Sequence, residues 1–179
     1  MGQSATLYAI DKNDFKKIAA NPEDSGLIKL ARYYEIFDKS FEGLRFLLSK
    51  NQNTNISELV DQVFYPKGFV GEEIDYSKLD FDNLPQDFDF EKQPIYYNSP
   101  ERVLEIANFL NTLSLDFIAA QYDADELNAN NIYPNDIWNN HIEENYAFNA
   151  RHMTEEFRNL KVFFNKAKEN DDYVLSFVG

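Results

Sequence analysis

The chain has 179 residues, of which 44% are hydrophobic, and its 31 acidic and 17 basic side chains give a net charge of −14. A chain of this size and apolar content can bury a core of its own, so we expect one globular domain and not a disordered chain. The acidic balance argues against binding to nucleic acid or to an anionic membrane, and the absence of cysteine excludes thiol catalysis, disulfides and iron–sulfur clusters.

The first fifty residues carry the patterns of one strand and three helices. An apolar run predicts a buried strand over 6–10, and Asp11 then has the position of a helix N-cap. Asn21-Pro22 ends that helix, because the residue before a proline disfavours the helical conformation. Apolar residues at steps of three and four predict a second helix over 27–37 and a third over 41–48.

The middle of the chain is less regular. Residues 56–63 have room for one or two helical turns, and a short strand is expected within 69–75. Acidic and apolar residues then interleave, which predicts a long acidic-aromatic loop insert at about 76–92. We expect its aromatic side chains to fold onto the core, and a docking segment is the alternative.

The second half contains stronger helix signals. Residues 95–97 have a strand composition, and Ser99-Pro100 is typical of a helix start, with serine as the cap and proline in the first turn. Ser114 can cap another short helix. An apolar stripe from Ile142 to Ala167 predicts a long final helix, and 173–178 is expected to be a buried closing strand.

These patterns favour an α+β fold, because the strands are few and do not alternate regularly with helices. We expect a single domain over residues 1–179, mostly helical around a small sheet that includes both terminal strands. No run approaches the roughly 18 consecutive apolar residues of a membrane helix, and no charged-then-apolar leader opens the chain. A cytoplasmic location is the expectation.

Several segments resemble one family. The sequence around residues 122–138 contains Asp123, Leu127-Asn128, Ile132-Tyr133-Pro134 and Trp138, which resemble the signature of the YfbM-like family of small bacterial proteins, a domain of unknown function. Residues 37–48 and 97–103 resemble two further segments of that family, and the final helix with its short apolar strand also fits. The resemblance spans nearly the whole chain.

The resemblance implies an α+β fold and a cytosolic bacterial setting, and it transfers no established activity. Two positions depart from the family pattern, where Phe41 stands for a tryptophan and Arg45 for a histidine. The glycine-rich middle of the family is replaced here by the insert at about 76–92. A function that depended on that histidine or those glycines would be lost or performed differently.

The two histidines do not form a convincing metal site. His141 and His152 each precede an acid by three residues, Glu144 and Glu155, which on a helix places each pair on one face. On one helix the two pairs would lie about 16 Å apart, too far to share a metal ion. Because no third histidine exists, we expect helix-stabilising polar pairs and neither a metal nor a cofactor.

The segment 122–138 contains the candidate binding residues. Asp123-Ala124-Asp125 begins like a calcium loop, but Leu127 stands where the third oxygen ligand belongs, so an EF-hand is rejected. Two interpretations remain for this segment. Its acids and asparagines cap short helices and turn the chain, or it forms a recognition surface. The candidate binding residues are Tyr122, Asp123, Asp125, Tyr133, Trp138 and His141.

Two functional hypotheses follow. The first is a non-catalytic cytosolic protein whose acidic surface binds a basic protein partner, for example an immunity-type protein that neutralises a basic toxin. The second is a small-ligand-binding protein or enzyme with a pocket near residues 122–138. The sequence contains no phosphate-binding loop and no serine-hydrolase motif, and it assigns no catalytic residue.

Overall fold

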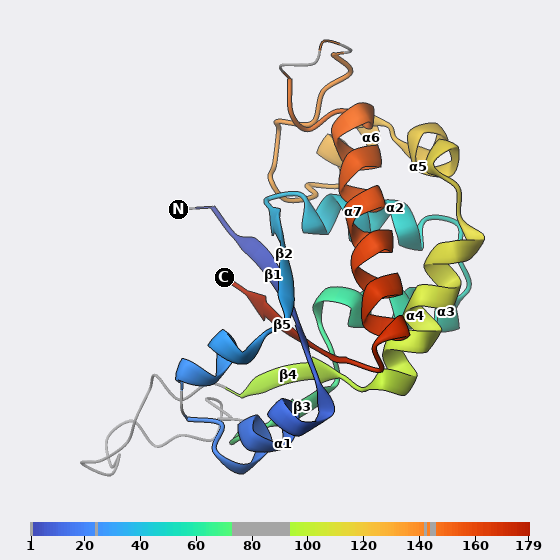
Figure 1. Ribbon diagram of the computed structural model, residues 1–179. Helices are drawn as coiled ribbons and strands as arrows, with labels where there is room; N and C mark the ends of the chain where they lie inside the picture. Colours follow the sequence, from blue (N-terminus) through green and yellow to red (C-terminus); the bar gives the residue numbers. More distant parts are fainter. Residues whose placement is uncertain (1, 24, 73–93, 142, 144–145) are drawn as a thin grey trace.

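The computed structural model describes residues 2–23, 25–72, 94–141, 143 and 146–179. These residues form a five-stranded antiparallel sheet in the order β2-β1-β5-β4-β3, with helices around it (Figure 1). The strands are β1 (Ser4–Ile10), β2 (Tyr33–Asp38), β3 (Gly68–Val70), β4 (Ile95–Asn98) and β5 (Tyr173–Val178).

Both terminal strands lie side by side in the sheet, as the sequence predicted. β1 pairs with β5 from Ala5↔Val178 to Ile10↔Tyr173. Ser4 and Gly179 close the ladder with two backbone hydrogen bonds of 2.8 and 3.0 Å. The two ends of the chain are therefore held at the centre of the sheet.

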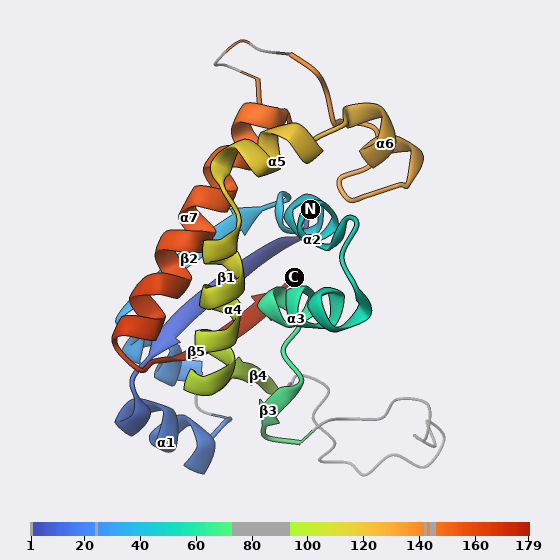
Figure 2. The same ribbon diagram turned by 90° about the vertical axis from the view of Figure 1, so that its right-hand side faces the viewer.

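Helices cover mainly one face of the sheet (Figure 2). They are α1 (Lys12–Ala20), the 3₁₀ helix η1 (Ser25–Leu30), α2 (Phe41–Ser49), α3 (Thr54–Phe64), α4 (Pro100–Thr112), α5 (Leu115–Gln121), α6 (Ala124–Ala129) and α7 (Ala150–Glu169). The caps expected from the sequence are confirmed at Asp11, Ser99 and Ser114, whose side chains each accept a backbone N–H of the first turn.

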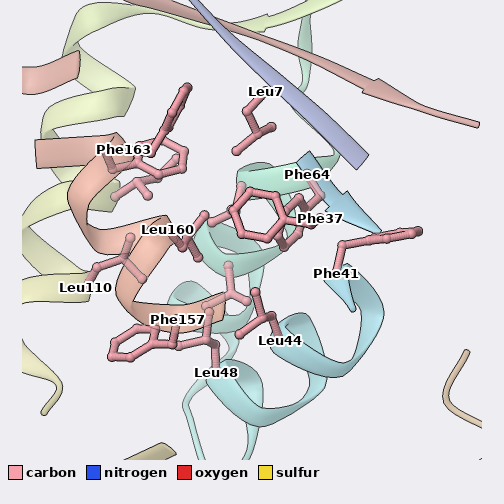
Figure 3. Close-up of a cluster of buried hydrophobic side chains, with 14 of the residues drawn as sticks. Leu7, Phe37, Phe41, Leu44, Leu48, Phe64, Leu110, Phe157, Leu160 and Phe163 are labelled. Carbon is pink, nitrogen blue, oxygen red and sulfur yellow. The ribbon is translucent and has the colours of Figure 1, made fainter. Parts of the chain in front are cut away.

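The main core lies between the sheet and the covering helices (Figure 3). Leu7 of β1 and Phe37 of β2 point into it from the sheet, and Phe64 of α3 packs edge-on against Phe37 at 5.4 Å between ring centroids. α7 contributes the stripe Met153, Phe157, Leu160, Phe164 and Ala167, all fully buried. The stripe steps at three and four residues, so it predicted the inner face of α7 correctly.

A smaller cluster lies on the opposite face of the sheet. Phe15 and Ile18 of α1 pack there with Ile10 and Leu175, and the Phe15 ring stacks on Tyr173 at 3.8 Å between centroids. α1 packs against one end of this face only. Tyr34 and Ile36 of the edge strand β2 remain 58% and 50% exposed.

The helix expected over 27–37 is wrong. The structure has η1 over 25–30, followed by β2 over 33–38. The segment Tyr-Tyr-Glu-Ile-Phe-Asp contains aromatic and β-branched residues that suit a pleated surface, and β1 supplies the partner strand. Of the residues that gave the helical spacing, Leu27 and Leu30 lie in η1, while Tyr34 and Phe37 lie on opposite faces of β2.

The final helix is shorter than expected, because it begins at Ala150 and not near Ile142. Asn149 is its N-cap and accepts the His152 N–H at 2.9 Å, while Phe148 before it has a φ of 56°, outside the helical range. Tyr146, expected on the apolar stripe, is exposed. Ile142, Glu144 and the insert expected at about 76–92 lie outside the described residues.

Within the described ranges, no single helix is long and apolar enough to cross a membrane. α4 and α5 meet the length and composition criteria only as a pair, and they are bent by 75° relative to each other.

Candidate functional site

α6 orients the first candidate residues of the segment 122–138. Asp123 is its N-cap, and the carboxylate accepts the Glu126 N–H at 3.1 Å. Ala124 and Leu127 on the inner face are buried, which fixes the helix against the core and leaves Asp125 exposed. Asp123 thus acts as a cap, and Asp125 lies on the exposed side of α6.

Trp138 is an interior residue, with 3% of its surface exposed. Its Nε1 donates to the Ile132 carbonyl oxygen at 2.8 Å. The Asn128 amide bonds to the Trp138 backbone in both directions, with Nδ2 donating to the carbonyl at 2.9 Å and Oδ1 accepting the N–H at 3.3 Å. The tryptophan therefore closes the loop that follows α6 and presents no recognition surface.

Tyr133 connects the same loop to the start of the chain. It precedes Pro134 in a cis peptide bond, and its hydroxyl accepts the Gln3 N–H at 2.7 Å. The ring lies 6.4 Å from Phe41, centroid to centroid. The contact joins this loop to the start of α2.

Tyr122 is half-buried and ties the segment to the start of α7. Its hydroxyl lies 2.8 Å from the Asn139 carbonyl oxygen and 2.6 Å from that of Phe148. Burial raises the pKa of Tyr122 to about 12, with the charge of Asp123 contributing in the same direction. The hydroxyl thus stays protonated at neutral pH and serves as a donor to the backbone.

A shallow hollow of about 240 Å³ opens beside Tyr122 and is lined also by Asn140, His141, Ala150 and Arg151. The His141 ring stacks on Tyr146 at 4.1 Å between centroids, and its Nδ1 lies 3.6 Å from a Glu143 carboxylate oxygen. His141 lies outside α7, so the prediction that both histidines share one helix is wrong. The hollow brings together Tyr122 and His141, two of the candidate binding residues.

His152 belongs to a different cluster that sequence reasoning missed. Its Nδ1 accepts the Phe148 N–H at 3.0 Å, so in the neutral ring the proton lies on Nε2, which is 3.8 Å from Glu156 Oε1. Ser40, fully buried, donates its hydroxyl to Glu156 Oε2 at 2.5 Å. The helical pair is therefore His152–Glu156 at four residues, while Glu155, the expected partner, bonds to Arg158.

Burial perturbs both ionisable groups of this cluster. It lowers the pKa of His152, with the Arg151 charge acting in the same direction. It raises the pKa of Glu156, where Asp38 and Glu155 add repulsion and the Ser40 hydrogen bond opposes the shift. Because Ser40 bonds to the carboxylate and not to the imidazole, the three residues lack the hydrogen-bond order of a serine nucleophile activated by histidine.

A second hollow of about 240 Å³ is lined by Arg45 and by residues of α2, α3 and the loop after α6, namely Glu42, Phe46, Ser49, Ser57, Asp61 and Ile132. The Arg45 guanidinium donates to Asp61 at 2.7 Å and to Glu42 at 2.6 Å, and it lies 5.4 Å from the centre of the Tyr65 ring. These contacts occupy Arg45 in a surface network that joins α2 to α3. Among the residues that the structure describes, no three metal-ligating side chains gather.

Comparison with known proteins gives a family and a fold. No curated protein matches the chain. The structure is similar to the crystal structure of a protein of unknown function, YfbM from Escherichia coli, with a TM-score of 0.63 and 13% sequence identity over 98% of this chain and 99% of that one. At this identity the likeness shows the fold alone.

The model of one sequence family, a domain of unknown function named DUF1877, matches residues 1–177. That match extends over the strands at both ends and all the helices between them. The chain therefore belongs to the DUF1877 family, as its resemblance to the YfbM-like proteins implied.

Proposed function

We propose that the protein is a non-catalytic binding protein whose acidic surface recognises a basic protein partner. An immunity-type protein that neutralises a basic toxin is one concrete version. A cytoplasmic location is part of this proposal.

The charge balance is the observation that supports it, because 31 acidic against 17 basic residues leave a net charge of −14. Many basic side chains in the described ranges are already paired with acids, namely Lys17, Arg32, Arg45, Lys50, Lys67, Arg102 and Arg158. Exposed acids outside any ion pair include Asp38, Glu101, Asp116, Asp123, Asp125, Asp136, Glu169 and Asp171. Lysines without an ion pair remain as well in this part of the chain, including Lys12, Lys16 and Lys166, so the support lies in the net charge of −14, which favours association with cationic partners.

The segment 122–138 supports the same choice. The polar groups of Tyr122, Tyr133 and Trp138 all bond to the chain's own backbone. Side chains engaged in this way hold the loop against the core and offer few groups to a small ligand. The exposed residues of the segment include three acids, Asp123, Asp125 and Asp136, beside three asparagines.

Capture from the native host's lysate, followed by mass spectrometry, tests the proposal. The bait is compared with a variant neutralised at Asp116→Asn, Asp125→Asn and Glu169→Gln, which are exposed and unpaired. A charge-retaining variant, with Asp116→Glu, Asp125→Glu and Glu169→Asp, is the matched control. We expect a basic protein that is retained by wild type and control, weakened in the neutralised variant, and released by salt. Recovery of no basic protein at low ionic strength would contradict the proposal.

A second candidate function is small-ligand binding in the hollow beside Tyr122. The observation in its favour is that His141 and Arg151, one able to become cationic and one permanently so, line the same 240 Å³ space. Titration of the two histidine ring signals by NMR with inorganic phosphate tests it. A response of His141 but not of His152 would support this function, and silence of both would contradict it.

A further inference from the structure

Among the described strands, β2 is an edge strand with a partner on one side only. It is the terminal strand of the sheet and pairs on one side with β1 (Figure 1). Lys39 donates its N–H to the Gln3 carbonyl at 3.2 Å. Because hydrogen-bonding groups alternate along an antiparallel strand, Phe37 and Glu35 also face β1, and the backbone groups of Tyr34 and Ile36 face outward.

The same two residues present apolar side chains on the outer face of the sheet. Tyr34 lies opposite Tyr8, with 5.8 Å between ring centroids, and Ile36 lies opposite Thr6. Tyr8 in turn meets Phe177 of β5 edge-on at 5.6 Å. Edge strands are usually guarded by lysine, proline or a bulge, and this one instead exposes a tyrosine and an isoleucine.

Acids lie on the other side of the strand, where it faces α7. Glu35 points toward that helix, and burial together with the charge of Glu156 raises the pKa of Glu35. Asp38 lies close enough to Glu156 to add repulsion there. Two cations lie near the start of the strand on this side: Lys166, 3.9 Å from the centre of the Tyr33 ring, and Arg32, which shares the Asp172 carboxylate with the Tyr33 hydroxyl. Glu35 is thus the acid that β2 presents toward α7, and Asp38 adds a second carboxylate at the end of the strand.

We propose that β2 is the docking edge for an extended basic segment of the partner, which adds a strand to the sheet. The proposal rests on the proposed function and gives it a location. In such a strand, alternate side chains point to opposite faces. Apolar side chains would cover Tyr34 and Ile36, and Lys or Arg side chains would reach Glu35. The partner segment is therefore one in which apolar and basic residues alternate.

Charge argues against a second copy of the chain as the occupant. Two copies joined edge to edge across β2 would bring their Glu35 side chains and the acids of both α7 helices together. Each copy also carries a net charge of −14. A basic segment relieves the repulsion that a second copy would increase.

Fluorescence anisotropy with a short, labelled, acetylated peptide in which lysine and valine alternate tests the docking edge. Two derivatives are N-methylated, one at the valines and the other at the lysines. Because N–H groups of successive residues point to opposite edges of a strand, only one set can bond to β2. We expect one derivative to bind like the parent peptide and the other to lose binding. Equal behaviour of the two derivatives overturns the proposal.

Two protein variants make the test specific to β2. Ile36→Lys is expected to weaken binding of the parent peptide by about tenfold or more, equivalent to about 1.4 kcal/mol. Leu104→Lys is the matched control, because Leu104 on α4 is similarly exposed, at 46%, and gains the same charge. Equal weakening in both variants, or a wild type that dimerises through β2 and binds no peptide, overturns the docking edge.

The outcomes separate this inference from the proposed function. A captured basic partner that binds Ile36→Lys as well as wild type contradicts the docking edge and leaves the proposed function intact. If peptide binding is lost with one N-methylated derivative only and is weakened by Ile36→Lys, while the lysate yields no basic partner, that result contradicts the proposed function alone.

Discussion

Trp138 packs against Gly43 so closely that a β-carbon on Gly43 would lie 2.3 Å from Cη2 of the indole ring. Gly43 lies inside α2, where alanine would ordinarily favour the helix by about 0.5–1 kcal/mol. The Trp138 ring leaves no room for a larger side chain at position 43. Glycine therefore occupies this position although alanine would favour the helix. The close approach couples α2 to the loop that follows α6.

Gly43→Ala is expected to lower the free energy of unfolding. Overpacking a filled core costs about 1–3 kcal/mol, which exceeds the gain in helix propensity. Urea denaturation followed by fluorescence of the single tryptophan measures the change directly at the contact. Gly179→Ala serves as the control, because nothing lies within 4 Å of a β-carbon there. An unchanged midpoint for Gly43→Ala would show that the indole ring moves aside without cost.

Asn128→Ala is expected to destabilise the loop around Trp138. The substitution leaves the Trp138 backbone N–H and carbonyl without the partners that the amide supplies, which costs about 1–3 kcal/mol. Asn130→Ala is the control, because its exposed amide bonds only to the Glu126 carbonyl in the helix end. The difference in unfolding midpoints, together with a red shift of the Trp138 emission in the native state, checks the prediction. Equal midpoints for the two variants would contradict it.

Local signals were the part of the fold that the sequence predicted. A cap such as Asp11, Ser99 or Asp123 bonds to an N–H within three residues, so its side chain and target are visible in a short window. The terminal strands were also recognisable, because 6–10 and 173–178 are short apolar runs with no helical spacing. The α+β class followed from these elements.

Long-range pairing explains what the sequence did not predict. Residues 33–38 satisfy helical spacing and strand alternation together, and only the presence of β1 decides between them. The Ser40–Glu156 hydrogen bond joins residues 116 apart in the chain, so no local pattern indicated it. The apolar stripe over 142–167 begins before α7 does. The helix starts at Ala150 after its N-cap Asn149, and apolar spacing alone does not indicate an N-cap. Sequence signals for the candidate site were correspondingly weak.

Tyr122→Phe distinguishes a structural from a ligand-binding role for this candidate residue. The substitution keeps the ring and removes the hydroxyl that bonds to Asn139 and Phe148, so we expect a loss of about 1–2 kcal/mol in unfolding free energy. Partner capture should be unchanged, because the hydroxyl is used within the chain. Wild-type stability combined with lost binding of any ligand in the hollow would reverse the assignment.

His152 is expected to make the protein less stable in mild acid. Its pKa in the folded state is lowered, mainly by burial, from the ordinary value of about 6.5. The unfolded chain therefore binds the proton more tightly, so the contribution of the neutral ring is complete above the unfolded pKa and is lost as the pH falls toward the folded pKa. Protonation of Nδ1 would also remove the acceptor of the Phe148 N–H. His152→Gln should flatten the fall in urea midpoint from about pH 7 to about pH 5.

The titration of Glu156 is expected to change the stability of the fold with pH in the direction opposite to that of His152. Its folded pKa is raised by burial first, so its contribution to stability is present at low pH and is lost as the pH rises through that folded pKa. Acidification of the wild type therefore combines a loss at His152 with a gain at Glu156. Glu156→Gln removes the gain and should make the fall in urea midpoint steeper between about pH 7 and pH 5, whereas His152→Gln makes it shallower. Parallel pH profiles in the two variants would mean that neither group titrates differently in the folded and unfolded chain, and the burial of this cluster would then have no effect on either pKa.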